Sequence, residues 1–548
     1  MRYLLSGLFM VLLATVISAQ EADSEYAKNW YNLDLAADNY PGMSVEKAYD
    51  FLKDKTSKKV VVAVIDSGID GEHEDLAPIM WTNPGETAGN GIDDDRNGYV
   101  DDVHGWNYIG GSDGENINYE NLEIVRLYNK LNAKYNNRNR DGLSKKERAE
   151  YDKYIEYKEE IEKKREELST QANFFSSTME AVNMLVQAIG KEPADITNED
   201  ITNYKGDEKI TTIATQIQSF LARFDSFGAL YEELEGGNEY FTGSYGKNWN
   251  PEFDARSIVG DDPSDLSDRN YGNNDIQGPD AGHGTHVAGI IAGVRGNNIG
   301  NDGVANNVSI MSVRAVPNGD ERDKDVANAI RYAVDNGAQV INMSFGKGQS
   351  PYKDAVDDAV RYARKRGVLL VHAAGNDGKL LTLENNFPND TYEKRGFFGP
   401  KGADNWIEVG ASTRYNDEKL PASFSNYDNQ LVDVFAPGQE IYSSTPDNNY
   451  AVYQGTSMAS PMVAGVAAML FSYFPDLSAE QVKEIIMAST VPYQSVVTVP
   501  GEESTGNFKD LSVTGGVVNA FNAVKIAAGT KGKNKKGGTR DASLMMAN

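Results

Sequence analysis

The chain has 548 residues, with 53 basic and 81 acidic side chains and a formal net charge of −28. Hydrophobic residues make up 40% of it, so the composition excludes a disordered polymer, a fibrous repeat and a protein with several membrane spans. The acidic balance indicates that nucleic acid is not a partner, because phosphate binding needs a basic surface. The sequence has no cysteine, which excludes disulfides, a thiolate nucleophile and a lipid anchor on cysteine.

The N-terminus predicts export. Arg2 precedes an apolar run over residues 3–17, and the small residues Ser18 and Ala19 follow it. This order is typical of a secretory signal peptide, and the run is short for a membrane span; an uncleaved anchor is the alternative. We expect residues 1–19 to be removed, leaving an exported protein, periplasmic or secreted, with no stable membrane anchor.

Alternating strand-like and helix-like segments predict an α/β fold. Unbroken apolar runs, rich in β-branched residues, are typical of strands buried on both faces of a parallel sheet. They occur at 59–65, 338–343, 367–373 and 406–409. Helix-like segments at 325–336 and 353–366 lie between them, and Ser44 is a predicted N-cap for an earlier helix through Lys53.

Residues 111–254 have a different character, with few strand signals. A capping box, Ser144 to Glu147, predicts a helix from Lys145 to about Gln171, and further helices are predicted over 174–189 and 211–234. Apolar a/d positions do not persist along the charged helix, so we expect solvated helices rather than a coiled coil. We predict a helical insertion (111–254) in a catalytic α/β domain formed by 20–110 and 255–528. Residues 529–548 are predicted to be a disordered basic tail.

Two segments place reactive side chains at element ends. Asp66 directly follows the first strand, where functional groups of open α/β sheets gather, although a turn-forming role is the alternative. His283 opens an apolar helix-like run. His286 follows at i+3, but no third ligand accompanies the pair, so we interpret His286 as a packed helix residue rather than a metal ligand.

Pro461 locates the start of another helix. Proline is tolerated in the first turn, where backbone N–H groups lack helical partners, so the helix should begin near Ser457. This places the Ser457 hydroxyl at the positive end of a helix dipole, beside a free N–H group, as a nucleophile requires. The alternative is that Thr456 or Ser457 only caps the helix. Asn376, at the end of another strand, offers a side-chain amide donor.

Four segments together resemble the subtilisin-like serine proteases (subtilases). DSGID at 66–70, HGTHVAG at 283–289, AAGN at 373–376 and GTSMASP at 455–461 match that family's signatures in its order. The similarity covers about 56–110 and 255–525. It implies a subtilisin-like, doubly wound, mostly parallel sheet with helices on both faces, and a serine endopeptidase that acts on protein or peptide substrates.

The resemblance also implies roles for individual residues. Ser457 would attack the scissile carbonyl, His283 would carry its proton, Asp66 would orient His283, and Asn376 would stabilise the oxyanion with the Ser457 N–H. The remaining implied residues would bind extended substrate as an added strand (Ser344, Phe345 and Gly346) or wall the pocket for the residue before the cut (Ala373, Ala374 and Gly375).

Two places could hold structural calcium. Oxygen-bearing side chains alternate around Gly98 as in calcium loops, although an acidic turn is the alternative; they are Asp93, Asp95, Asn97 and Asp101. By the resemblance, Asp75 and Asn297 align with a structural calcium site of many subtilases. We expect bound Ca²⁺ and no organic cofactor.

The sequence departs from the family pattern at two points. Only residues 20–55 precede the first core strand, so a large N-terminal propeptide is not expected. The insertion lies between Asp66 and His283, and we expect it to emerge near the cleft rim and to restrict access or recruit substrate. A catalytically silent binding protein of the same fold and a subtilase-type peptide ligase are the alternative functions.

Overall fold

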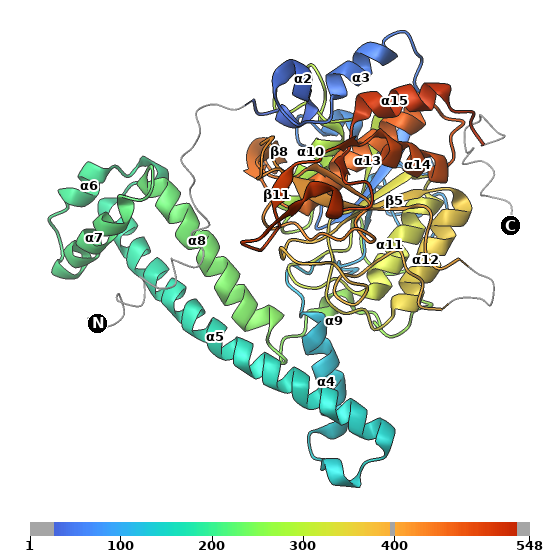
Figure 1. Ribbon diagram of the computed structural model, residues 1–548. Helices are drawn as coiled ribbons and strands as arrows, with labels where there is room; N and C mark the ends of the chain where they lie inside the picture. Colours follow the sequence, from blue (N-terminus) through green and yellow to red (C-terminus); the bar gives the residue numbers. More distant parts are fainter. Residues whose placement is uncertain (1–26, 395–399, 534–548) are drawn as a thin grey trace.

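The computed structural model describes residues 27–394 and 400–533 (Figure 1). The predicted signal peptide and most of the predicted tail lie outside these residues. The first tail residues are described, and there the Lys533 N–H donates to Gln481 Oε1 over 2.9 Å.

A nine-stranded sheet forms the centre of the molecule, in the order β10-β13-β7-β6-β5-β4-β1-β3-β2. Its neighbours are parallel except for β10 and β13, which are antiparallel. The strands are β1 (Val60–Asp66), β2 (Gly105–Asn107), β3 (Val308–Arg314), β4 (Val340–Met343), β5 (Leu369–Ala373), β6 (Trp406–Ser412), β7 (Val434–Pro437), β10 (Val491–Pro492) and β13 (Gly516–Val517). All four predicted strands are therefore present, as β1, β4, β5 and β6. Two small antiparallel pairs are separate, β8 (Ile441–Thr445) with β9 (Asn449–Tyr453) and β11 (Val496–Thr498) with β12 (Thr505–Asn507).

Helices cover both faces of this sheet (Figure 1). Alternate residues of β1 point to opposite layers: Val62 and Val64 pack in one core cluster, Ala63 and Ile65 in the other. The first layer contains α3 (Val45–Leu52), α10 (Gly282–Ala292), α13 (Thr456–Tyr473), α14 (Ala479–Ser489) and α15 (Ala520–Gly529). The second contains α11 (Asp323–Asp335) and α12 (Lys353–Arg366). The predicted α/β fold with helices on both faces is confirmed.

A helical arm, residues 123–248, projects away from the sheet (Figure 1). It contains α4 (Glu123–Tyr135), α5 (Lys145–Ile189), α6 (Asn198–Thr202), α7 (Glu208–Leu221), α8 (Phe227–Gly243) and the π-helical turn Ser244–Asn248. Helices α5 and α8 run side by side, and α6 and α7 lie at the far tip. The two ends of the arm meet, because the Leu122 N–H donates to the Asn248 carbonyl over 3.1 Å. Two short helices lie outside the arm, α2 (Leu35–Asp38) and α9 (Arg256–Val259). Among the described helices, none is long and apolar enough to cross a membrane.

Three helix predictions were wrong in detail. The segments 145–171 and 174–189 form one helix, α5, because no glycine or proline interrupts it before Gly190, which ends it at φ 75°. The segment 211–234 is two helices, since the Ser226 hydroxyl accepts from Ala229 N and starts α8 anew. Ser44 occupies the N-cap position of α3 without capping it; its hydroxyl donates to Asp34 instead.

The a/d pattern of α5 also persists further than expected. Buried residues recur at seven-residue spacing in Tyr154, Ile161 and Leu168, and Val182 continues the same register. Arg165 interrupts the apolar pattern, but its guanidinium donates to the carbonyls of Tyr245 and Trp249. A charged residue at this position makes the row of apolar residues hard to recognise in the sequence. In the folded arm the two hydrogen bonds satisfy the guanidinium, so the row can still be buried.

Candidate active site

Asp66 and His283 meet at the carboxyl end of β1. Asp66 is the last residue of β1 and is 2% exposed, and His283 lies in the first turn of α10. The His283 Nδ1 atom lies 2.7 Å from Asp66 Oδ1. Gly284 permits this approach, because a Cβ there would lie 2.1 Å from the Gly68 carbonyl oxygen. The predicted pair is therefore in direct contact.

The surroundings of His283 favour the protonated, charged form of its imidazole. Burial lowers its pKa, but the charge and hydrogen bond of Asp66, with a smaller contribution from Asp280, outweigh burial. The net pKa is raised above the ordinary 6.5. The side chain keeps 38% exposure, so the imidazole edge remains accessible.

Ser457 is the second residue of α13, where Pro461 predicted a helix start. Its hydroxyl donates to the Ser344 carbonyl over 3.1 Å, and the Ser344 hydroxyl donates in turn to the Ser457 carbonyl over 2.9 Å. Both Ser457 and His283 lie in the described part of the chain, and no hydrogen bond joins them in this conformation.

Asn376 is oriented by Thr456. Its Oδ1 accepts from Thr456 N over 2.8 Å and from the Thr456 hydroxyl over 3.0 Å. The amide nitrogen therefore turns toward Gly455: a Cβ added to Gly455 would lie 3.4 Å from Asn376 Nδ2 and 3.6 Å from Ser457 N. Two nitrogen donors from separate segments, Asn376 Nδ2 and Ser457 N, thus lie close to one point beside Gly455.

These residues line a cleft of about 770 Å³. Ser457, Thr456 and Asn376 line it together with the segment Ser344–Gly346 and with Ala373 and Gly375. Ala374, which was also predicted to wall the pocket, does not line the cleft; it is 0% exposed because its side chain packs in a core cluster. Residues of the arm and its ends form part of the wall, a contribution that sequence spacing could not reveal; they are Leu122, Glu123, Ile124, Glu160 and Trp249. The expectation that the insertion emerges near the cleft rim agrees with this placement.

Phe345 and Gly346 present a free backbone edge. Within the described residues, neither residue's N–H or carbonyl enters a backbone–backbone hydrogen bond, whereas Lys347 pairs in both directions with Phe387. Lys347 is buried, and its ammonium lies 2.8 Å from Glu123 Oε2 and 2.9 Å from Asp323 Oδ1. Lys347, which directly follows the Phe345–Gly346 edge, therefore connects this edge to Glu123 at the base of the arm.

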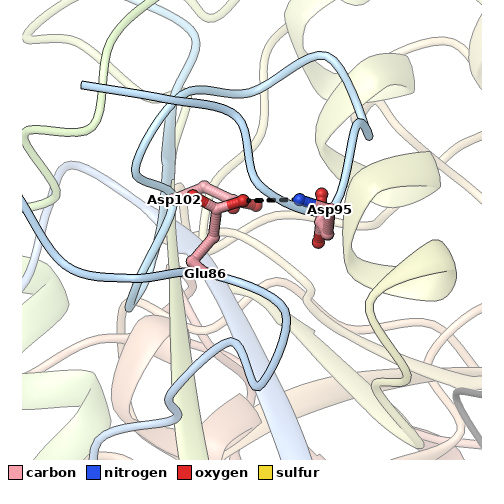
Figure 2. A group of neighbouring side chains, drawn as sticks. All are labelled: Glu86, Asp95 and Asp102. Carbon is pink, nitrogen blue, oxygen red and sulfur yellow. Dashed lines mark hydrogen bonds between the residues drawn. The ribbon is translucent and has the colours of Figure 1, made fainter. Parts of the chain in front are cut away.

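The expected calcium loop gathers a different set of carboxylates. Asp93 and Asp101 accept from backbone N–H groups of their own loop, and Asn97 Nδ2 donates to Asp95 and Asp102. Of the predicted ligands, only Asp95 belongs to a three-carboxylate group, which it forms with Glu86 and Asp102 (Figure 2). Glu86 Oε2 is buried without a partner. Burial raises the pKa of Asp102 to about 7 despite hydrogen bonds from Tyr332, Asn83 and Asn97.

Asp75 and Asn297 are also brought together. Asp75 Oδ1 accepts from Asn297 Nδ2 over 2.7 Å and from Val294 N over 3.0 Å. The residue is 0% exposed, its Oδ2 has no partner, and burial raises its pKa. An unpaired buried carboxylate oxygen is costly unless a proton or a cation satisfies it.

His286 is a packed helix residue, as predicted. It is 0% exposed, its Nε2 lies 3.1 Å from the Ile441 carbonyl, and its ring stacks on Tyr453. Burial lowers its pKa to about 3, so it stays neutral.

Known proteins give an independent comparison. A family model described as the subtilase family (peptidase S8) matches residues 57–535. The chain is 42% identical over 223 residues to the thermophilic serine proteinase of Bacillus sp. (strain AK1), covering 40% of this chain and 49% of that protein. It is 45% identical over 192 residues to thermitase of Thermoactinomyces vulgaris, covering 35% of this chain and 61% of thermitase. It is 41% identical over 205 residues to subtilisin DY of Bacillus licheniformis, covering 37% and 68%.

The aligned segments thus span about half to two thirds of the length of these relatives. The family model, by contrast, runs from the start of β1 past the end of α15 and includes all four signature segments. The chain belongs to the subtilase family.

Proposed function

We propose that this protein is an exported serine endopeptidase that hydrolyses peptide bonds through Ser457, His283 and Asp66. The observation that carries the proposal is that Ser457 and Asn376 line one cleft, with Asn376 Nδ2 and Ser457 N both within 4 Å of one point beside Gly455. The Asp66–His283 pair lies at the start of the neighbouring helix and supplies a base held in a defined orientation.

In the proposed reaction, Ser457 turns its hydroxyl from the Ser344 carbonyl to His283 Nε2. This requires the Ser457 side chain to reorient, and apo catalytic hydrogen bonds often form fully once substrate binds. His283 takes the hydroxyl proton as Oγ attacks the carbonyl, and then delivers it to the leaving amine. Asp66, bonded to Nδ1, holds the tautomer and stabilises the imidazolium. Water then hydrolyses the acyl-enzyme by the same proton route.

Asn376 and the Ser457 N–H stabilise the oxyanion. Thr456 occupies Asn376 Oδ1, which leaves the amide nitrogen as the group that faces the reacting carbonyl. Donors fixed in this way need no reorganisation during the reaction, and each is worth roughly 3 kcal/mol of transition-state stabilisation.

Substrate binds as an added strand along Phe345 and Gly346. Their unpaired backbone groups support this mode, which gives affinity without selecting side chains. Ser344 lies beside Ser457, and Ala373 and Gly375 form another wall of the pocket for the residue before the cut.

Calcium would act as a structural ion. Two groups of oxygen atoms fit it: Asp75 with Asn297, and Asp95 with Glu86 and Asp102 in the loop that also contains Asp93, Asn97 and Asp101. Each contains a buried carboxylate oxygen without a partner, the kind of donor that a hard cation satisfies. A bound ion would neutralise these carboxylates and hold their loops in place.

A fluorophosphonate probe tests the nucleophile. We expect stoichiometric labelling of the wild type and none of Ser457→Ala, together with hydrolysis of casein by the wild type only. Unlabelled wild type would instead indicate a catalytically silent binding protein. Product masses from one defined peptide, incubated with an added amine, separate hydrolysis from acyl transfer and so test the ligase alternative.

A further inference from the structure

Asn386 joins the two walls of the pocket beside the nucleophile. Its Nδ2 donates to the carbonyls of Ala373 and Ala374 over 3.4 and 3.2 Å. Its Oδ1 lies against the opposite wall, because a Cβ added to Gly346 would come within 2.5 Å of it. Asn386 is 7% exposed and lines the same cleft as Ser457. It therefore closes the space between the walls.

The orientation of this amide is determined by its neighbours. Nδ2 faces three acceptors, the two wall carbonyls and Glu408 Oε1 at 3.4 Å, and a flipped amide would place oxygen against all three. Within the described residues Oδ1 accepts no hydrogen bond, and it is not among the buried atoms left without a partner. Oδ1 is thus an unpaired acceptor that keeps some exposure, on a residue that lines the cleft beside Gly346.

Glu408 strengthens Asn386 Oδ1 as a hydrogen-bond acceptor. The carboxylate is 4% exposed and accepts from His372 Nδ1 over 2.9 Å and from Trp406 Nε1 over 2.8 Å. Its third contact, to Asn386 Nδ2, draws the amide hydrogen toward a negative charge. Hydrogen bonds in such a chain polarise one another, so the outward oxygen becomes a better acceptor.

In the proposed function, this pocket receives the side chain next to the attacked carbonyl. Ser457 lines the same cleft, and its Oγ lies 3.1 Å from the Ser344 carbonyl. We propose that Asn386 makes this pocket select, immediately before the cleaved bond, a side chain that ends in an N–H donor, such as glutamine or lysine. The inference rests on the proposed endopeptidase function and names its substrate class.

Matched peptides test the preference. Three fluorogenic peptides differ only in the residue before the cut: glutamine, its apolar near-isostere methionine, and glutamate. For the wild type we expect kcat/KM for glutamine to exceed that for methionine roughly tenfold, with glutamate the poorest, because the oxygen repels a second acceptor. In Asn386→Leu the glutamine-to-methionine ratio should fall to about one or below.

The control is Asn429→Leu, the same change at an exposed asparagine outside the cleft lining. It should keep the wild-type ratio. Fluorophosphonate labelling of Ser457 measures the correctly folded fraction of each variant, and Asn386→Ser provides a smaller change if the leucine variant does not fold.

The possible results distinguish failure of the proposed preference from failure of the proposed endopeptidase function. Hydrolysis with equal or reversed preference in the wild type, or a preference unchanged in both Asn386 variants, overturns the inference alone. No hydrolysis and no labelling overturns the proposed function and the inference with it.

Discussion

At the residue scale, Asn376 uses the two ends of one amide for different purposes. Its oxygen accepts from Thr456 N and so holds the start of α13, while its nitrogen lies near Gly455 and in the proposed reaction stabilises the oxyanion. The variant Asn376→Asp keeps an oxygen for Thr456 and removes the donor.

We therefore predict that Asn376→Asp lowers kcat about 100- to 1,000-fold with little change in KM, because the lost interaction exists only in the transition state. Steady-state kinetics with one peptide measures this, and the thermal midpoint checks that α13 remains in place. An effect confined to KM would remove Asn376 from the oxyanion role.

The pH dependence of activity follows from His283. The base must be neutral to accept the Ser457 proton, and its pKa is raised above 6.5 by Asp66 and Asp280 against the opposing effect of burial. The acid limb of kcat/KM should therefore lie above pH 6.5. Replacing Asp280 by Asn removes one raising charge, so the limb should move to lower pH.

The pH profile of kcat/KM for wild type and Asp280→Asn checks this prediction. Asp265→Asn, which removes an exposed acid that does not act on His283, is the control and should leave the limb unchanged. A limb that moves upward in Asp280→Asn would contradict the assigned base.

At the element scale, two adjacent glycines of α8 should respond in opposite ways to alanine. A Cβ at Gly236 meets nothing within 4 Å, whereas a Cβ at Gly237 would lie 2.3 Å from the ring of Phe175 on α5. Gly236→Ala should stabilise the arm by about 0.5–1 kcal/mol through helix propensity. Gly237→Ala should destabilise it, because the Phe175 ring, stacked on Phe241, must move.

Hydrogen–deuterium exchange of α5 and α8 in the whole protein measures both effects. We expect slower exchange in Gly236→Ala and faster exchange in Gly237→Ala. Equal behaviour of the two variants would show that α5 and α8 do not pack in solution as they do here.

The arm can be removed at its base because its two ends are hydrogen-bonded to each other. Replacing residues 124–247 with a short Gly/Ser linker keeps Leu122, Glu123 and Trp249. Arm residues line the cleft together with Lys347, Gly348 and Gln349, which follow the Phe345–Gly346 edge along the chain. At about 3.3 Å per residue, a strand bound along this edge would reach them four or five residues before the cut.

We therefore predict that arm removal lowers kcat/KM about tenfold for peptides with five residues before the cut and less than twofold for peptides with two. Trp249→Ala in the full chain should reproduce part of the loss for the longer peptides. Unchanged cleavage of both peptides and of folded proteins would contradict a role for the arm in access or recruitment.

At the scale of the whole molecule, the chain has no cysteine and so no disulfide bond can stabilise the fold. We propose that bound ions stabilise it instead. Calcium should raise the thermal midpoint, since a ligand that binds only the folded state adds about 2.7 kcal/mol at a hundredfold excess over Kd. Asp75→Asn should remove part of this gain by eliminating the unpaired oxygen, and Glu86→Gln should remove another part.

Thermal unfolding of metal-stripped protein, with added Ca²⁺ or Mg²⁺, measures the gain. Mg²⁺ is the control, because it holds its water more tightly and fits such sites poorly. A midpoint indifferent to calcium in the wild type would contradict both sites.

Local signals in the sequence were sufficient for four of the nine strands of the sheet and for the starts of several helices. The β-branched run before Asp66, the cap and proline signals around Ser144 and Pro461, and the four family segments all depend on neighbours within a few residues. Signals of this range predicted β1, the starts of α5 and α13, and the residues that line the catalytic end of the cleft.

The features that local signals did not predict depend on contacts between distant segments. The seven-residue stripe of α5 was hidden because Arg165 interrupts its apolar pattern. The carbonyls that satisfy Arg165, those of Tyr245 and Trp249, lie about 80 residues further along the chain. Glu86 joins Asp95 and Asp102 only through the folding of the loop, and Asn386 faces the cleft only because Ala373, Ala374 and Glu408 orient its amide. The sequence alone determined the α/β fold and the family, since periodicity and short motifs are local. Tertiary structure alone decided which side chains share a pocket, because that depends on how segments hundreds of residues apart pack together.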